Sequence, residues 1–131
     1  MTLYDSSVLI DYLNGEEAAV RYTADHLDTR AVAPPLVMFE VYQGEVFKSG
    51  PADFAAVDAA LEWVTVVDET RDLARTAAEF QNELHQGGST LAARDAFIAG
   101  TAHGLNERLA VSDSDFDVEG VRNSIDVDFV Y

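Results

Sequence analysis

The sequence contains no cysteine, which excludes disulfide bridges, thiolate nucleophiles and cysteine-ligated zinc sites. It also has no apolar run that approaches the length of a membrane-spanning helix. Its first ten residues, MTLYDSSVLI, include an acidic residue and no basic one, so they do not have the pattern of a secretory signal peptide. These absences predict a soluble cytoplasmic protein that does not associate with membranes.

Basic residues are scarce as well. The chain carries 24 acidic residues against 8 basic ones, giving a formal net charge of −16, and Lys48 is its single lysine. We favour adaptation to concentrated salt as the reason for the excess of acids. The Debye length is about 3 Å at 1 M salt, so repulsion between the charges of an acidic surface is largely screened there. Affinity for a basic partner is an alternative. A cluster of metal-binding carboxylates is another, although it would account for only a few of the acids.

The 131 residues fit one domain, residues 1–131, and 48% of them are hydrophobic, enough to form a core despite the charge. Apolar periodicity predicts short strands separated by amphipathic helices. That alternation is typical of an α/β domain with a central, mostly parallel sheet of four or five strands covered on both faces. The expected strands are TLYD, AVAPP, VTVV, RLAVS and SIDVDFVY, the last of them at an edge of the sheet.

The expected helices follow from stretches of 3.6-residue periodicity and from their end signals. The first has Ser6 or Ser7 as its N-cap, and the fourth begins at Pro51. A long amphipathic helix carries a stripe of Leu73, Ala77, Phe80 and Leu84. The segments are SSVLIDYLNG, EEAAVRYTADHLD, LVMFEVYQGEVFKSG, PADFAAVDAALEW, DETRDLARTAAEFQNELHQGG and the small-residue segment TLAARDAFIAGTAHG.

Four acidic residues from distant segments are expected to meet. Asp5 ends the first strand, Asp113 follows the RLAV strand, Glu40 lies on the helix after AVAPP, and Asp95 opens the small-residue helix. Ligand sites of open parallel sheets lie beyond the carboxyl ends of the strands, so these side chains can converge at one edge. Carboxylates brought together repel each other, and a bound hard cation such as Mg²⁺ or Mn²⁺ relieves that repulsion. Such a site can cleave a phosphodiester.

Each of these acids also has a simpler interpretation. Asp5 could cap the first helix, Asp113 and Asp115 could be ordinary loop residues, and Asp95 could pair with Arg94. Adjacent residues of a helix do not face each other, so we expect Arg94 to point away from Asp95. That geometry favours a metal partner for Asp95.

Other catalytic motifs do not fit the sequence. The three histidines lack the spacing of a zinc site, and no GxSxG motif marks a serine hydrolase. A calcium-binding EF-hand loop that began at Asp113 would need Gly at its sixth position and Glu at its twelfth, where this sequence has Val118 and Ser124. A haloacid-dehalogenase-like phosphatase would have a second Asp at the position of Ser7.

Four segments in a fixed order carry a resemblance to a known family: YDSSVLIDYL, FEVYQGEV, ARDAFIAGTA and VSDSDF. Together they resemble the PIN-domain family, and within it the VapC-type toxin ribonucleases. The resemblance covers essentially the whole chain and implies a PIN-like α/β/α sandwich. It implies that Asp5, Glu40, Asp95 and Asp113 are catalytic and bind Mg²⁺ or Mn²⁺, with Asp115 as a supporting metal ligand. Val111 is a departure, because members of the family often carry Thr or Ser there.

The same resemblance implies an endoribonuclease that cleaves structured RNA such as tRNA or rRNA, forms a homodimer and is inhibited by a VapB-like antitoxin. The scarcity of basic residues leaves few candidates for contacting RNA phosphates, namely Arg71, Arg75, Arg94 and Lys48. Two alternatives stay open. One is a PIN nuclease of RNA processing that is not a toxin, and the other is a non-catalytic module that binds RNA or protein.

Overall fold

The computed structural model describes all 131 residues and contains one five-stranded sheet in the order β3-β2-β1-β4-β5. All four strand pairings are parallel, which confirms the predicted sheet and places β5 at an edge. The central strand β1 pairs with β4 far along the chain, with Leu3 opposite Leu109. The strands are β1 (Thr2–Tyr4), β2 (Ala31–Ala33), β3 (Val64–Val66), β4 (Arg108–Val111) and β5 (Val127–Phe129).

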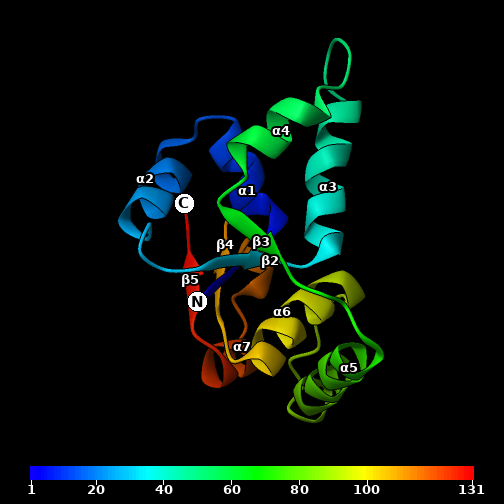
Figure 1. Cartoon of the computed structure of the whole chain (residues 1–131). Coiled ribbons are helices and arrows are strands. Elements are labelled where there is room, and N and C mark those ends of the chain that lie inside the picture. Colours follow the sequence, from blue (N-terminus) through cyan, green and yellow to red (C-terminus); the bar gives the residue numbers. More distant parts are fainter.

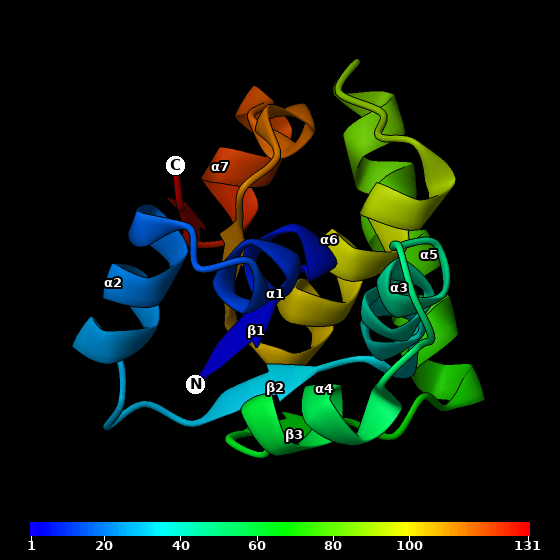
Figure 2. The same ribbon diagram turned by 90° about the horizontal axis from the view of Figure 1, so that it is seen from above.

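Helices cover both faces of this sheet. In Figure 1, α1 to α4 lie on one side of the strands and α5 to α7 lie on the other, and Figure 2 shows α1 crossing above β1. The arrangement is the predicted α/β/α sandwich. No helix is both long and apolar enough to cross a membrane. The helices are α1 (Ser6–Leu13), α2 (Glu17–Asp25), α3 (Pro35–Val46), α4 (Phe54–Ala60), α5 (Arg71–Gln86), α6 (Ala93–Leu105), α7 (Glu119–Ser124) and the 3₁₀ helix η1 (Ser114–Phe116).

The structure corrects several predicted helix boundaries. Of the three residues considered as the N-cap of α1, Asp5 holds that position and Ser6 and Ser7 do not, because the Asp5 side chain accepts a hydrogen bond from the backbone of Ser7. Helix α4 begins at Phe54, later than Pro51, and is capped by the side chain of Asp53. Both α7 and η1 are absent from the sequence prediction. Each is too short to show the repeated apolar spacing that identifies a helix.

The small residues of α6 allow it to pack closely against α5. Ala77, Phe80 and Leu84 of the predicted α5 stripe are buried. On α6, a Cβ atom added to Gly100 would lie 2.6 Å from the Cα of Ala77. Only glycine fits this contact, so the two backbones touch and α6 is fixed between α5 and the sheet. This packing positions the first turn of α6 at the edge where β1 and β4 end.

Candidate active site

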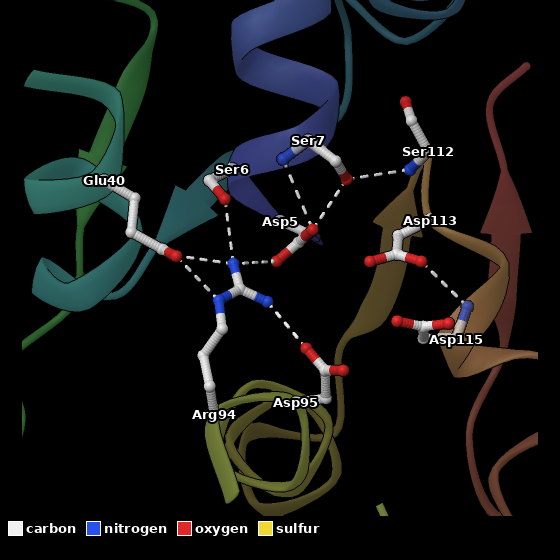
Figure 3. Close-up of polar contacts among 9 residues, drawn as sticks. All are labelled: Asp5, Ser6, Ser7, Glu40, Arg94, Asp95, Ser112, Asp113 and Asp115. Atoms are coloured by element: carbon white, nitrogen blue, oxygen red, sulfur yellow. Dashed lines mark hydrogen bonds and ion pairs between the residues drawn. The ribbon is translucent and has the colours of Figure 1, made fainter. Parts of the chain in front are cut away.

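Acidic side chains from four segments meet beyond the carboxyl ends of β1 and β4 (Figure 3). Asp5 directly follows β1, and Asp113 comes two residues after β4. Glu40 extends from α3, and Asp95 lies in the first turn of α6. We refer to Asp5, Glu40, Asp95 and Asp113 as the carboxylate cluster. The structure therefore brings the four acids selected from the sequence to one edge of the sheet.

The guanidinium of Arg94 lies inside this cluster (Figure 3). It binds Glu40 through two bonds, from Nε to Oε2 at 2.8 Å and from Nη2 to Oε1 at 2.6 Å. Its Nη2 also donates to Asp5 Oδ1 at 2.7 Å, and its Nη1 donates to Asp95 Oδ1 at 2.8 Å. One cation thus pairs with three carboxylates from α3, from α6 and from the turn between β1 and α1.

The expectation that Arg94 points away from Asp95 is wrong. Both residues lie in the first turn of α6, where no preceding turn of helix separates their side chains. The long Arg94 side chain extends beyond the end of the helix, and Asp95 turns toward the same point. The rule that adjacent residues diverge describes side chains along the cylinder of a helix, and it does not hold for a long side chain that leaves the helix at its end.

Two serines support the site: Ser7 holds Asp5, and Ser6 contacts Arg94. The Ser7 hydroxyl donates to Asp5 Oδ2 at 2.6 Å and accepts a bond from the backbone N–H of Ser112 at 2.9 Å. The Ser6 hydroxyl accepts a bond from Arg94 Nη2 at 2.8 Å. Asp5, only 1% exposed, therefore caps α1 and belongs to the carboxylate cluster at once. These serine contacts were not predicted from the sequence, although the position of the serines directly after a strand was a signal.

The charges in the cluster act on each other. Burial raises the pKa of Asp95, Arg94 lowers it in part, and the negative charges of Asp5 and Asp113 raise it again. Burial by itself would lower the pKa of Arg94, but the hydrogen bond with Glu40 and the charge of Asp5 outweigh burial and raise that pKa. Arg94 is therefore firmly cationic, while Asp95 still experiences repulsion from its acidic neighbours.

The donor atoms of the cluster suit a hard divalent cation, since all of them are carboxylate or hydroxyl oxygens. As the side chains stand, no three acidic side chains are arranged around a single cation position. The guanidinium of Arg94 lies between the oxygens that would have to approach one another. The residues fit Mg²⁺ or Mn²⁺ in chemistry, and Arg94 must move for them to fit it in geometry.

Asp113 and Asp115 differ in their relation to the cluster. Asp113 is partly buried, and its charge contributes to the raised pKa of Asp95. Its Oδ1 accepts a bond from the backbone N–H of Asp115 at 2.8 Å, which starts η1. The Asp115 side chain is exposed. The geometry thus favours Asp113 as the inner acid and Asp115 as an outer one.

The other basic residues considered for RNA contact lie apart from the carboxylate cluster. Lys48 pairs with Glu45 at 2.7 Å just after α3, and Arg75 pairs with Glu79 at 3.2 Å on α5. Arg71 is exposed at the first position of α5. Arg94 differs from these residues, because its guanidinium pairs with three carboxylates of the cluster at once.

The fold is shared with several solved toxin–antitoxin structures. A DNA-bound VapBC structure from Salmonella typhimurium matches with a TM-score of 0.80 at 16% identity, covering 99% of this chain and 98% of that one. A promoter-bound VapBC2 structure from Rickettsia felis matches with a TM-score of 0.75 at 13% identity, covering 98% and 97%. A toxin–antitoxin complex from Klebsiella pneumoniae matches with a TM-score of 0.74 at 20% identity, covering 100% and 98%.

Similarity in sequence is weaker than similarity in fold. No curated protein matches the chain in sequence. The sequence pattern of the PIN domain nevertheless matches residues 2–119, which include all of the carboxylate cluster. Together with the parallel five-stranded sheet and the acids at its carboxyl edge, this match shows that the chain belongs to the PIN-domain family.

Proposed function

We propose that the protein is a metal-dependent endoribonuclease that acts as the toxin of a toxin–antitoxin pair. The observation that carries the proposal is the convergence of Asp5, Glu40, Asp95 and Asp113 at the edge of the sheet. Membership of the PIN-domain family and the likeness to toxin–antitoxin structures support it. The substrate would be a structured RNA such as tRNA or rRNA.

The side chains of the cluster differ in exposure, and this suggests different roles. The Asp5 and Asp95 side chains are 2% and 11% exposed, whereas that of Glu40 is 26% exposed. Asp5 and Asp95 would form the floor of the site and hold a Mg²⁺ or Mn²⁺ ion, together with Asp113. Glu40 would complete the site from its rim, and Asp115 would act as a supporting acid. The ion, when bound, stabilises negative charge on the phosphodiester.

Purified protein in molar KCl should cleave a structured RNA when Mn²⁺ or Mg²⁺ is present, and EDTA should stop the cleavage. Asp95→Asn should reduce the cleavage rate at least about a hundredfold, because the metal loses an inner carboxylate. Asp25→Asn is the matched control, since Asp25 is exposed on α2 and outside the cluster. Cleavage that is unaffected by EDTA and by Asp95→Asn would contradict the enzymatic proposal and leave a non-catalytic binding module.

A VapB-like antitoxin is the proposed partner, and an apolar groove beside the site supports this proposal. The groove has a volume of about 460 Å³ and lies between α3 and α4. Phe39, which precedes Glu40 in α3, is 60% exposed, and Phe47 is 79% exposed. An antitoxin tail can place apolar anchors in such a groove and a basic residue near the adjacent carboxylates. The groove is lined by Phe39, Tyr42, Gln43, Val46, Phe47, Phe54 and Asp58.

The toxin role is tested with the product of a short reading frame encoded next to this chain. Co-expression should give a stable complex in which RNA cleavage is suppressed. Phe47→Asp, which places a charge in the groove, should weaken that complex and leave cleavage by the free protein intact. An active protein that no neighbouring gene product inhibits would instead be an RNA-processing nuclease.

We also propose that the protein forms a homodimer. The apolar side chain of Val20 supports it, since Val20 is 41% exposed on α2, one of the two helices selected from the sequence. Two-fold dimers are the commonest oligomers among soluble proteins. Light scattering in molar KCl should give twice the chain mass at micromolar concentration, and a monomer mass would contradict this expectation.

A further inference from the structure

The surroundings of Arg94 Nη2 are unusual for a hydrogen-bond donor. This nitrogen lies 2.6 Å from Glu40 Oε1, 2.7 Å from Asp5 Oδ1 and 2.8 Å from Ser6 Oγ. It carries only two hydrogens for these three oxygens. Oxygens from three side chains therefore surround one nitrogen that can donate only two hydrogen bonds. Such an arrangement resembles the coordination of a cation more than ordinary hydrogen bonding to a guanidinium.

The charge of Arg94 does not balance its surroundings. The carboxylate cluster and Asp115 together hold five acids, and Arg94 is the single basic side chain bonded among them. Arg94 pairs with Asp5, Glu40 and Asp95 but makes no ion pair with Asp113. A divalent cation would neutralise more of this charge than one guanidinium does, although the two cannot occupy the same space between the carboxylates.

We propose that Arg94 is a displaceable internal cation, which holds Asp5, Glu40 and Asp95 together in the metal-free protein and leaves them when a divalent cation binds. This inference rests on the metal site of the proposed function. The Arg94 side chain is 30% exposed, so it has a route to solvent that the buried Asp5 does not have. Metal binding and release of Arg94 are then a single exchange.

The exchange weakens the observed affinity for metal. If the state with Arg94 swung out is a minor one, the apparent dissociation constant rises by the inverse of its population. A population of roughly a tenth makes the wild-type protein bind Mn²⁺ about tenfold more weakly than a variant without the guanidinium. The same variant should melt at a lower temperature in EDTA, because its carboxylates then repel each other without compensation.

Calorimetric titration of the full chain with Mn²⁺ in a fixed KCl concentration tests this inference. Arg94→Gln should bind Mn²⁺ at least about tenfold more tightly than wild type. Arg94→Lys should fall between the two, because its ammonium keeps the positive charge but lacks the planar donor fork with which Arg94 binds Glu40 through two nitrogens. Arg21→Gln is the matched control. It removes one positive charge from an exposed pair on α2 and should leave the affinity for Mn²⁺ unchanged.

A second measurement follows Arg94 itself. Phenylglyoxal modifies accessible guanidinium groups, and the peptide that contains Arg94 can be quantified by mass spectrometry. Saturating Mn²⁺ should speed the modification of Arg94 several-fold and should not change that of Arg21. This readout does not depend on RNA cleavage, and it also applies if Arg94→Gln proves too unstable to titrate.

The outcomes separate this inference from the proposed function. Tighter binding by Arg94→Gln together with Mn²⁺-stimulated modification of Arg94 would establish the exchange. Equal or weaker binding by Arg94→Gln, or slower modification with Mn²⁺, would overturn it while leaving a metal-dependent nuclease in place. If neither wild type nor Arg94→Gln binds Mn²⁺, both the exchange and the proposed metal site are wrong.

Discussion

The first turn and the middle of α6 are held in opposite ways. At its first turn, Arg94 and Asp95 take part in a cluster of charged groups with several possible partners. Farther along, Gly100 lies against the backbone of Ala77 on α5, with no space for a single additional carbon. In the exchange that we propose, the first region releases one cation and binds another, whereas the second region has one arrangement only. A rigid packing seam thus supports an adjustable polar site within the same helix.

Gly100→Ala should have the largest effect on stability. The new Cβ would lie 2.6 Å from Ala77 Cα and 3.0 Å from its carbonyl oxygen, so α5 and α6 would have to separate. We expect a loss of roughly 2–3 kcal/mol in the free energy of unfolding, measured by urea denaturation in fixed salt. Gly44→Ala in α3 is the control, because a Cβ at Gly44 meets nothing within 4 Å. That change should stabilise by about 0.5–1 kcal/mol. Equal effects of the two substitutions would mean that α5 and α6 leave room for a methyl group at Gly100.

Tyr22→Phe should have an intermediate effect. The Tyr22 hydroxyl donates to Asp128 Oδ2 at 2.6 Å and connects α2 to the edge strand β5. Removing this bond should cost about 1.5 kcal/mol, since Asp128 keeps only a longer contact of 3.3 Å with Arg108. Tyr12→Phe is the control, because the Tyr12 ring packs on Trp63 without such a bond to a carboxylate. Urea denaturation at pH 7 measures both variants.

The same contact predicts an alkaline loss of stability. Burial, and then the hydrogen bond with Asp128, raise the pKa of Tyr22 above its ordinary value of 10.0. Tyr22 ionises near pH 10 in the unfolded chain, whereas the folded side chain keeps its proton. The contribution of Tyr22 to the free energy of unfolding is therefore complete below pH 10 and is lost as the pH rises further. Burial and Asp128 also raise the pKa of Tyr4 to about 12, so part of the loss should persist in Tyr22→Phe. A wild-type protein that is as stable at pH 11 as at pH 8 would contradict this prediction.

Asp95→Asn should have the smallest effect on stability, in spite of the ion pair that it removes. The pKa of Asp95 is raised in the folded protein, so protonation of its carboxyl group favours the folded state. This contribution to stability is complete below the ordinary pKa of 3.8 and is lost as the pH rises through the folded-state pKa. At pH 7 the charged carboxylate is therefore a net cost to the fold. The neutral variant in EDTA should therefore melt at the same temperature as wild type or slightly higher. A clear loss would show that the Arg94–Asp95 pair holds α6 in place.

The fold and the position of the acids could be predicted from the sequence because both depend on local patterns. Alternating strands and helices fix a parallel sheet, and acids placed just after β1 and β4 must then share an edge. Asp5 illustrates how two interpretations can both hold, since it caps α1 with one oxygen and binds Arg94 with the other.

The partners of Arg94 could not be predicted in the same way. Glu40 and Asp5 lie 54 and 89 residues away from it in the chain, and no periodicity connects such distant positions. The hydroxyl contacts of Ser6 and Ser7 depend on the same three-dimensional arrangement. Sequence patterns therefore identified which acids would meet, and only the folded structure identified the cation between them.

The central position of β1 affects when the site can form during synthesis. The backbone N–H of Asp5 donates to the carbonyl oxygen of Ala110 at 3.0 Å, and the Ser7 hydroxyl contacts Ser112. Ribosomes add only about 5–20 residues each second, and pairings between such distant segments are slow to form. Asp5 emerges early, but its neighbouring strand emerges more than a hundred residues later. A nascent chain that has not reached β4 therefore cannot assemble the carboxylate cluster, because both the strand that pairs with β1 and the Asp113 side chain are still missing.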